Sequence, residues 1–94
     1  MQVRMTAKPG AGDPLADLLL QAAAALRDDP RCLLYVVSRV TGEPDVILIT
    51  EAWSDREAHD ASLRTEAARA LIAEARPLIE SSEAVEIEPA GKPL

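Results

Sequence analysis

The sequence predicts an α+β fold in which an antiparallel four-stranded sheet carries its helices on one face. Three observations lead to this prediction. Segments with the hydrophobic periods of strands and helices follow one another as strand, helix, strand, strand, helix, strand. The length of 94 residues leaves room for one domain, so we treat residues 1–94 as a single unit. The strands in the middle of the chain are apolar on both faces, which requires a cover on each side of the sheet.

The first strand is predicted over residues 2–7, where apolar and polar side chains alternate. A turn containing proline and glycine follows at residues 9–12. The next segment predicts a helix from Pro14 to Arg27, with Asp13 as its N-cap and leucines and alanines at helical spacing. An Asp-Asp-Pro run then ends this helix, because the residue before a proline disfavours helical backbone.

A β-hairpin is predicted from residues 32–40 and 46–53, which are rich in valine, leucine and isoleucine and flank a Thr-Gly-Glu-Pro turn. The pairing register stays open in the sequence. A four-residue loop places Tyr35 opposite Thr50, whereas a shift by one residue places Tyr35 opposite Glu51. Only the second register puts Tyr35 on the same face as the tryptophan that ends the second strand.

The second helical region begins with a match to a capping box, in which the side chains of Ser54 and Glu57 would each accept from the other's backbone amide. A short helix is expected to reach about Arg64. A further helix is expected to start at Thr65, and Pro77 should kink or divide it.

The last strand is predicted over residues 84–88, with Val85 and Ile87 facing inward. The order of elements is that of a ferredoxin-like βαββαβ fold, which packs both helices on one face of the sheet. The opposite face would then stay bare although the hairpin is apolar there too, and a large bare apolar face usually marks an interface. We therefore expect a homodimer formed through the open sheet face.

Charge and composition argue against several classes of protein. Sixteen acidic and ten basic residues give a net charge of −6, which disfavours a nucleic-acid partner or an anionic membrane surface. Cys32 is the only cysteine, so the sequence contains no internal disulfide and no cysteine-rich metal motif. No apolar stretch has the length of a membrane span or the position of a signal peptide. We expect a cytoplasmic protein without a metal site.

Three short motifs, in this order, resemble the antibiotic biosynthesis monooxygenase (ABM) domain. They are Lys8-Pro9-Gly10, the segment from Pro30 to Tyr35 (PRCLLY) and the segment from Glu51 to Ala58 (EAWSDREA). The resemblance covers essentially the whole chain. It implies a dimeric α+β barrel and, as in the best-known enzymes of the family, oxidation of polyphenols or quinols by O2 with no cofactor.

Oxidation of this kind makes a specific chemical demand. Ground-state oxygen reacts poorly with ordinary organic molecules, so without flavin or metal the substrate itself must supply electrons, most readily as a phenolate or enolate. Such a site needs an apolar pocket, a base and hydrogen-bond donors for the developing oxyanion. The expected partners are therefore a small aromatic molecule and O2.

Two residues are the catalytic candidates. Trp53 matches the tryptophan of the family and could donate its indole N–H to a substrate oxygen, with a packing role as the alternative. His59 is the only side chain expected to titrate unaided near neutrality and is a candidate base, with a solvated histidine as the alternative. The family more often has histidine at the position of Ser62, so Ser62 is a candidate for substrate binding.

Two further candidates for substrate binding lie on the first hairpin strand. Tyr35 aligns with a tyrosine of the family and offers a hydroxyl donor, although cross-strand packing explains it equally well. Arg39 could hold an anionic substrate, and an ion-paired arginine is the commoner case. Heme degradation is disfavoured, since the relatives that perform it use an asparagine on the first strand and none is present here.

The leading hypothesis is thus a dimeric, cofactor-independent monooxygenase acting on a phenolic, quinol or polyketide-like molecule. A non-catalytic binding or accessory dimer is the first alternative, because Ser62 replaces the usual histidine. An oxygen-independent isomerase is the second, since related families use the same barrel to move protons without O2.

Overall fold

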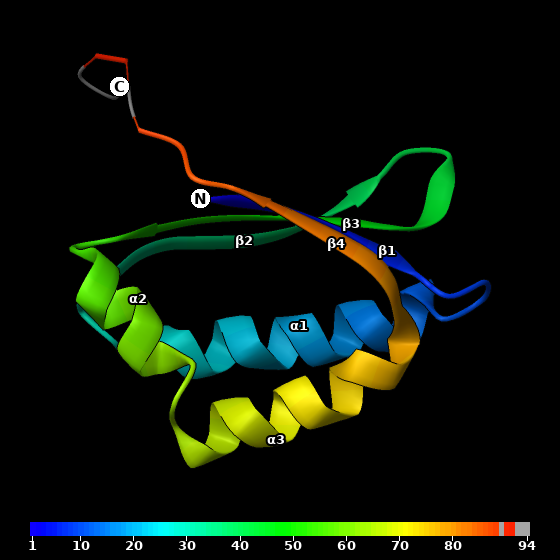
Figure 1. The fold of residues 1–94 in the computed structure, drawn as a ribbon, viewed down its shortest axis with the longest axis horizontal. Helices are drawn as coiled ribbons and strands as arrows, with labels where there is room; N and C mark the ends of the chain where they lie inside the picture. Colours follow the sequence, from blue (N-terminus) through cyan, green and yellow to red (C-terminus); the bar gives the residue numbers. More distant parts are fainter. Residues whose placement is uncertain (89, 92–94) are drawn as a thin grey trace.

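The computed structural model describes residues 1–88, 90 and 91, and its helices lie together on one side of a sheet (Figure 1). The elements along the chain are β1 (Gln2–Ala7), α1 (Gly12–Leu26), β2 (Cys32–Val40), β3 (Glu43–Trp53), α2 (Arg56–Ser62), α3 (Glu66–Ala75), the 3-10 helix η1 (Arg76–Leu78) and β4 (Ile79–Val85).

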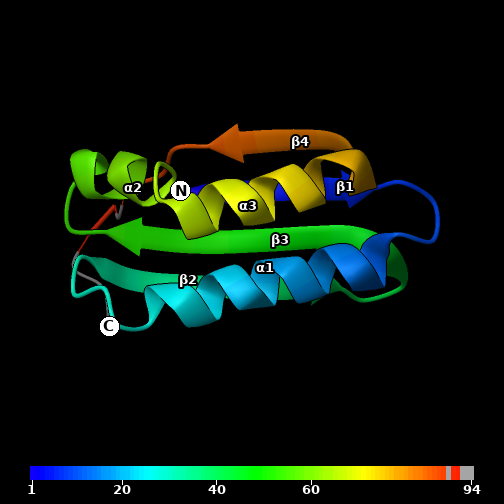
Figure 2. The ribbon, with the colours of Figure 1, turned by 90° about the horizontal axis from the view of Figure 1, so that it is seen from below.

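The four strands form one antiparallel sheet in the order β2-β3-β1-β4. Figure 2 shows α1 under the β2 and β3 side of the sheet, and α3 and α2 nearer to β1 and β4. No helix covers the other face within the described residues. This arrangement confirms the predicted ferredoxin-like α+β fold, with a second helical region divided into α2, α3 and η1.

The hairpin adopts the second of the two registers considered above. Tyr35 pairs with Glu51, and the turn is tighter than expected because Val40 already pairs with Glu43. The two-residue loop contains Gly42 at a φ of 82°, a backbone conformation that a β-carbon would strain. An irregularity after Arg39 absorbs the extra residues of β3. Tyr35, Glu51 and Trp53 consequently share the face that carries the helices.

The core is aliphatic, as the near absence of aromatic residues requires. Leu15 of α1 and Ile47 of β3 are fully buried where the helix crosses the centre of the sheet. The remaining buried members of this cluster come from β1, α1, β3 and α3, and are Val3, Ala7, Ala16, Leu19, Ile49 and Ala75.

The first helix begins earlier than predicted, and Asp13 does not cap it. The helix starts at Gly12, its N-cap residue Ala11 makes no side-chain cap bond, and Asp13 lies in the first turn. Instead, the carboxylate of Asp45 on β3 accepts hydrogen bonds from the amides of Gly10 (3.2 Å) and Gly12 (3.1 Å). A residue remote in sequence therefore supplies the cap, which local pattern matching cannot detect.

The capping box predicted from Ser54 is wrong by one residue. Asp55 is the N-cap of α2, and its carboxylate accepts from the amide of Ala58 at 2.7 Å. An aspartate and a serine in succession offer two nearly equal caps, and the chain uses the carboxylate. The predicted start at Thr65 is confirmed, since its hydroxyl oxygen accepts from the amide of Ala68 at 3.1 Å.

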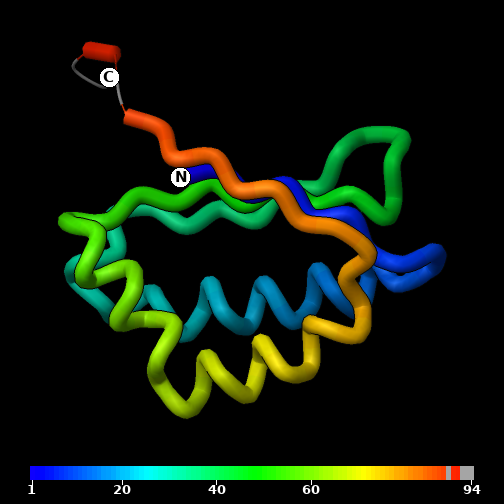
Figure 3. Tube along the Cα trace, in the orientation of Figure 1, coloured from blue at the N-terminus to red at the C-terminus, as the bar shows by residue number. Residues whose placement is uncertain are grey.

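The last strand was predicted too late in the chain. Pro77 falls in η1, and this turn delivers the chain directly to the sheet, where β4 pairs with β1 from Ile79 to Val85. Val85 and Ile87 are 57% and 53% exposed, so the prediction that they face inward is wrong. A polar edge strand beside β1 shows little alternation of apolar and polar residues, so its period is hard to detect in the sequence. Residues 86–88 lead away from the sheet (Figure 3).

Candidate functional site

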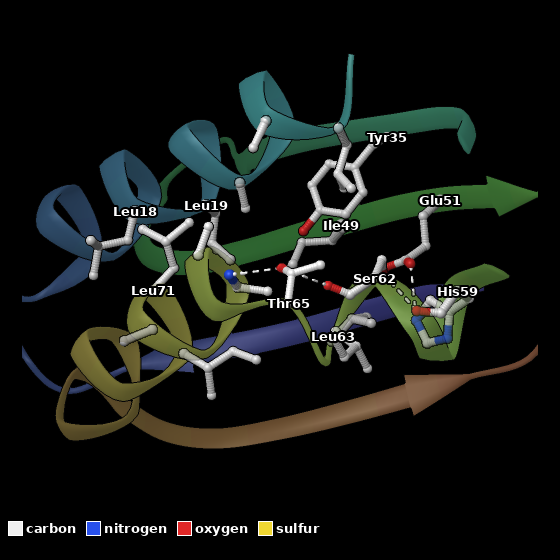
Figure 4. Close-up of a pocket in the computed structure, with 18 of the residues that line it drawn as sticks. Leu18, Leu19, Tyr35, Ile49, Glu51, His59, Ser62, Leu63, Thr65 and Leu71 are labelled. Carbon is white, nitrogen blue, oxygen red and sulfur yellow. Dashed lines mark hydrogen bonds and ion pairs between the residues drawn. The ribbon is translucent and has the colours of Figure 1, made fainter. Parts of the chain in front are cut away.

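A cavity of about 620 Å³ lies between the helices and the sheet. Aliphatic side chains of β1, β3, α1 and α3 form most of its wall, and Figure 4 shows Leu18, Leu19 and Leu71 at one end. The opposite end carries four polar or aromatic side chains, which we call the polar end: Tyr35, Glu51, Trp53 and His59. The cavity therefore combines an apolar body with a compact group of donors and acceptors.

Glu51 is the centre of the polar end. It is the one charged residue buried within the described part of the chain, with 7% of its surface exposed. Its carboxylate oxygen Oε1 accepts a hydrogen bond of 2.8 Å from Trp53 Nε1 and lies 3.2 Å from His59 Nε2. A buried carboxylate needs such partners, because the transfer of an unpaired charge from water into an apolar interior is very costly.

His59 projects from α2 and has a carboxylate near each ring nitrogen. Its Nε2 faces Glu51, and its Nδ1 lies 3.1 Å from Oδ1 of Asp60. The imidazole also meets the indole of Trp53 edge to face, with ring centroids 5.8 Å apart and an interplanar angle of 72°. One helical turn further on, the Ser62 hydroxyl donates to the backbone carbonyl of His59 at 2.6 Å.

Tyr35 enters the polar end from β2, directly opposite Glu51. Burial raises the pKa of its phenol to about 12, and the negative charge of Glu51 adds to the effect. The hydroxyl therefore stays protonated across the physiological range and can donate a hydrogen bond into the cavity.

The family model for antibiotic biosynthesis monooxygenase matches residues 1–74. The chain belongs to this family. The predicted resemblance is thus confirmed. Among curated proteins, no sequence matches the chain significantly.

Solved structures of the ABM fold align with nearly the whole chain. A candidate ABM protein of Chloroflexus aurantiacus is 36% identical, with a TM-score of 0.75 over 96% of this chain and 93% of that one. A second, from Deinococcus radiodurans, is 27% identical, with a TM-score of 0.79 over 99% and 95% of the two chains. A third, from Bacteroides thetaiotaomicron, is 16% identical, with a TM-score of 0.82 over 99% and 92%, which shows the shared fold alone.

The ABM fold brings four of the five predicted site residues to one cavity: Tyr35, Trp53, His59 and Ser62. Arg39 is not among the cavity residues. It forms an ion pair with Asp13 at 2.8 Å and donates to the carbonyl oxygen of Pro44 at 2.7 Å. The structure thus places Arg39 in the ion-paired role that was its alternative, and we omit it from the site.

Glu51 is the site residue that sequence reasoning missed. In the sequence, Glu51 stands out only as the first residue of a family motif and as a possible partner of Tyr35. The signal was nevertheless present, since Glu51 is an acidic residue between apolar neighbours on a strand with both faces covered. Such a residue must either point to solvent or have buried partners, and the side chains two residues on and on the next helix provide them.

Other chemical groups lie outside this site. The thiol of Cys32 has its pKa raised chiefly by burial, and the cavity wall does not include it. Within residues 1–88, 90 and 91, no group of three histidine, cysteine or acidic side chains is arranged to hold a metal ion. In the same part of the chain, every helix is too short or too polar to span a bilayer.

Proposed function

We propose that this ABM-family chain acts, through residues 1–94 as one domain, as a cofactor-independent monooxygenase. Its substrate would be a phenolic, quinol or polyketide-like small molecule. The observation that carries the proposal is the polar end of the cavity, where a protonated phenol and a buried carboxylate paired with an imidazole meet in a mostly apolar space. This is the combination of base, donor and apolar surroundings that substrate-driven reaction with O2 demands.

The reaction begins with removal of a proton from the substrate, which leaves a phenolate or enolate. This anion passes one electron to O2, and the resulting substrate radical and superoxide combine to form a carbon–oxygen bond. The carbon-bound peroxide then loses its outer oxygen as water, taking up the two hydrogens that the substrate gives up. One oxygen atom remains on the carbon as a carbonyl, so the substrate supplies all the electrons.

Each residue of the polar end has its own role in this reaction. Tyr35 donates to the oxyanion, and the indole of Trp53 provides a flat surface against which an aromatic ring can stack. The proton acceptor is either His59, as the sequence suggested, or Glu51, which lies beside it. Ser62 lines the cavity and orders the first turn after His59 through its hydrogen bond to the backbone.

We further propose that two copies associate through the open sheet face. Leu34 and Val36 on β2 are exposed there, although both are apolar. Pairing of this face with a second copy would remove apolar surface from water, the main favourable term in most protein association.

One observation favours a second candidate, a binding or accessory dimer without catalysis. Both ring nitrogens of His59 already lie within 3.2 Å of a carboxylate oxygen. A histidine held in this way stabilises the polar end and leaves the cavity able to bind a ligand that it does not transform.

The test is oxygen uptake by the purified protein, treated with chelator, with a panel of hydroquinones, anthrones and catechols. We expect uptake above the spontaneous rate and its loss in Trp53→Phe and His59→Ala. Glu74→Gln, an exposed position on α3, is the matched control. Tight binding without uptake would favour the accessory role, and conversion of substrate without O2 would favour an isomerase.

A further inference from the structure

We propose that Glu51 is the residue that accepts the substrate proton, through its carboxylate oxygen Oε2, and that Tyr35 donates to a neighbouring oxygen of the same substrate. The inference rests on the proposed oxygenase function and deepens it. It defines the ligand by its chemistry, namely an acidic O–H group next to a second oxygen that can accept a hydrogen bond, as in a hydroxy-carbonyl or a vicinal diol on an aromatic ring.

The two carboxylate oxygens of Glu51 are in different situations. Oε1 is occupied by two groups, Trp53 Nε1 at 2.8 Å and His59 Nε2 at 3.2 Å. These partners hold the carboxylate in one orientation and supply the polar contacts that a buried carboxylate needs. A base must accept the substrate proton on an oxygen that these contacts leave free.

The second oxygen, Oε2, has no hydrogen-bond partner among residues 1–88, 90 and 91. In this same part of the chain, every fully buried side-chain nitrogen or oxygen atom has a partner. Oε2 must therefore touch accessible space, and Glu51 contributes to the wall of the cavity. The unpaired oxygen belongs to a side chain that lines the cavity, and Figure 4 shows Glu51 extending from β3 toward His59.

His59 is less suited to contact the substrate directly. Its Nε2 is engaged by Glu51 and its Nδ1 by Asp60, so a ligand would have to displace one carboxylate before it reached a ring nitrogen. A protonated imidazole satisfies both carboxylates at once, whereas a neutral one can donate to only one of them. His59 is therefore a positioning residue that acts through Glu51.

Tyr35 provides the second contact. It is the cross-strand partner of Glu51, and directly paired residues on one face have their β-carbons about 5 Å apart. The raised pKa of Tyr35, to about 12, is caused first by burial and then by the charge of Glu51. A donor and an acceptor that project side by side from paired strands match an acceptor and a donor that lie side by side on one ligand.

The proton balance of the step is simple. The substrate O–H bond breaks, a new O–H bond forms at Oε2 of Glu51, and the electron pair stays on the substrate oxygen. The negative charge thus moves from the carboxylate to the substrate, where the Tyr35 hydroxyl can donate to it. No oxidant takes part at this stage, so the proton transfer can be observed without turnover.

The test uses alizarin, an anthraquinone with adjacent hydroxyl and carbonyl groups whose visible spectrum changes when a hydroxyl ionises. Below the pH at which free alizarin ionises, we expect the wild-type protein to bind it with the spectrum of the anion. We expect Glu51→Gln to bind it with the neutral spectrum, at least about tenfold less ionised. His59→Ala should retain part of the shift, and Glu74→Gln should retain all of it.

Two results would overturn the inference. The first is an unchanged anion spectrum with Glu51→Gln, whatever the result for His59→Ala. The second is failure of the wild type to bind alizarin, which would refute the ligand class. If Glu51→Gln does not fold, Glu51→Asp keeps the charge but withdraws the oxygen, and an undiminished shift in that variant would also refute the role. Oxygen uptake with other substrates tests the oxygenase proposal separately.

Discussion

Tyr35 and Glu51 are directly paired across the β2–β3 hairpin, and both side chains enter the same cavity. A phenol and a carboxylate in this position cannot both carry charge at low cost, because two like charges would share a space with little water. Tyr35 therefore keeps its proton over a wide pH range and remains a neutral donor beside Glu51. In the proposed complex, Tyr35 donates to one ligand oxygen and Glu51 accepts the proton of the neighbouring O–H group.

The first prediction concerns the titration of Tyr35. Because its pKa is raised from the usual 10 to about 12, the folded protein retains a proton that the unfolded chain loses. The contribution of Tyr35 to stability is thus complete below pH 10 and is lost as the pH rises toward 12, by at most about 1.4 kcal/mol per pH unit. The protein contains one tyrosine, so phenolate absorbance near 295 nm reports it directly. Titration at the ordinary value in the folded protein would contradict the burial described here, and Tyr35→Phe should remove the signal.

The second prediction concerns the core. Ile47 is fully buried beneath α1, so truncation to alanine leaves a cavity and should lower the free energy of unfolding by about 2–5 kcal/mol. Leu33 on β2 is 65% exposed, and its truncation should cost less than about 0.5 kcal/mol. Denaturation by urea, monitored by circular dichroism, measures both. Equal effects of the two substitutions would show that the packing described for Ile47 is wrong.

The fold could be predicted from the sequence because its strongest signals are local and agree with one another. The alternation in β1, the helical spacing after Pro14 and the apolar hairpin strands each indicate one element type, and their order allows few topologies. The error at the cap of α1 occurred because the deciding partner is remote. Asp45 replaces Asp13 as the source of the cap, and no pattern within the helix reveals this.

The candidate site could be predicted only in part, for a related reason. Trp53 and His59 stand out as rare residue types, whereas Glu51 is one of many acidic residues and becomes distinctive only through burial. Whether Tyr35 joins this site depends on the hairpin register. That register is decided by a two-residue turn and an irregularity in β3, which the sequence leaves open.

The third prediction tests the contact between α1 and β3. A β-carbon on Gly12 would lie 2.0 Å from the carbonyl oxygen of Pro44 and 2.9 Å from Oδ1 of Asp45, so backbone must move. We expect Gly12→Ala to lower the free energy of unfolding by about 2 kcal/mol, although alanine favours helix more than glycine does. Gly91→Ala is the control, since nothing lies within 4 Å of its β-carbon. A neutral or stabilising effect of Gly12→Ala would mean that the backbone at Pro44 and Asp45 can move aside without a cost in stability.

The fourth prediction tests the proposed dimer. A charge on the open sheet face should prevent association, because an unpaired carboxylate buried between two apolar faces is costly. We expect the wild type to have the mass of a dimer by light scattering at micromolar concentration and Val36→Asp to have that of a monomer. Leu20→Asp, an equally drastic change at an exposed position of α1, should remain dimeric. A monomeric wild type, or dissociation by Leu20→Asp alone, would place the interface elsewhere or remove it.

The fifth prediction tests whether the ligand binds in the cavity, with an exposed position of α3 as the control. Ala68 lines the cavity, whereas Ala70 on the same helix is exposed and does not. Ala68→Leu places three additional carbon atoms in the space a ligand needs, so we expect it to weaken alizarin binding at least about tenfold, which is 1.4 kcal/mol or more. The same change should stabilise the protein by about 1 kcal/mol, since it fills a void with apolar volume. Ala70→Leu adds the same atoms on the exposed side of α3, so it should change neither the affinity for alizarin nor the stability of the protein. Equal binding by the two variants, measured by titration of the visible spectrum, would show that the ligand binds outside the cavity.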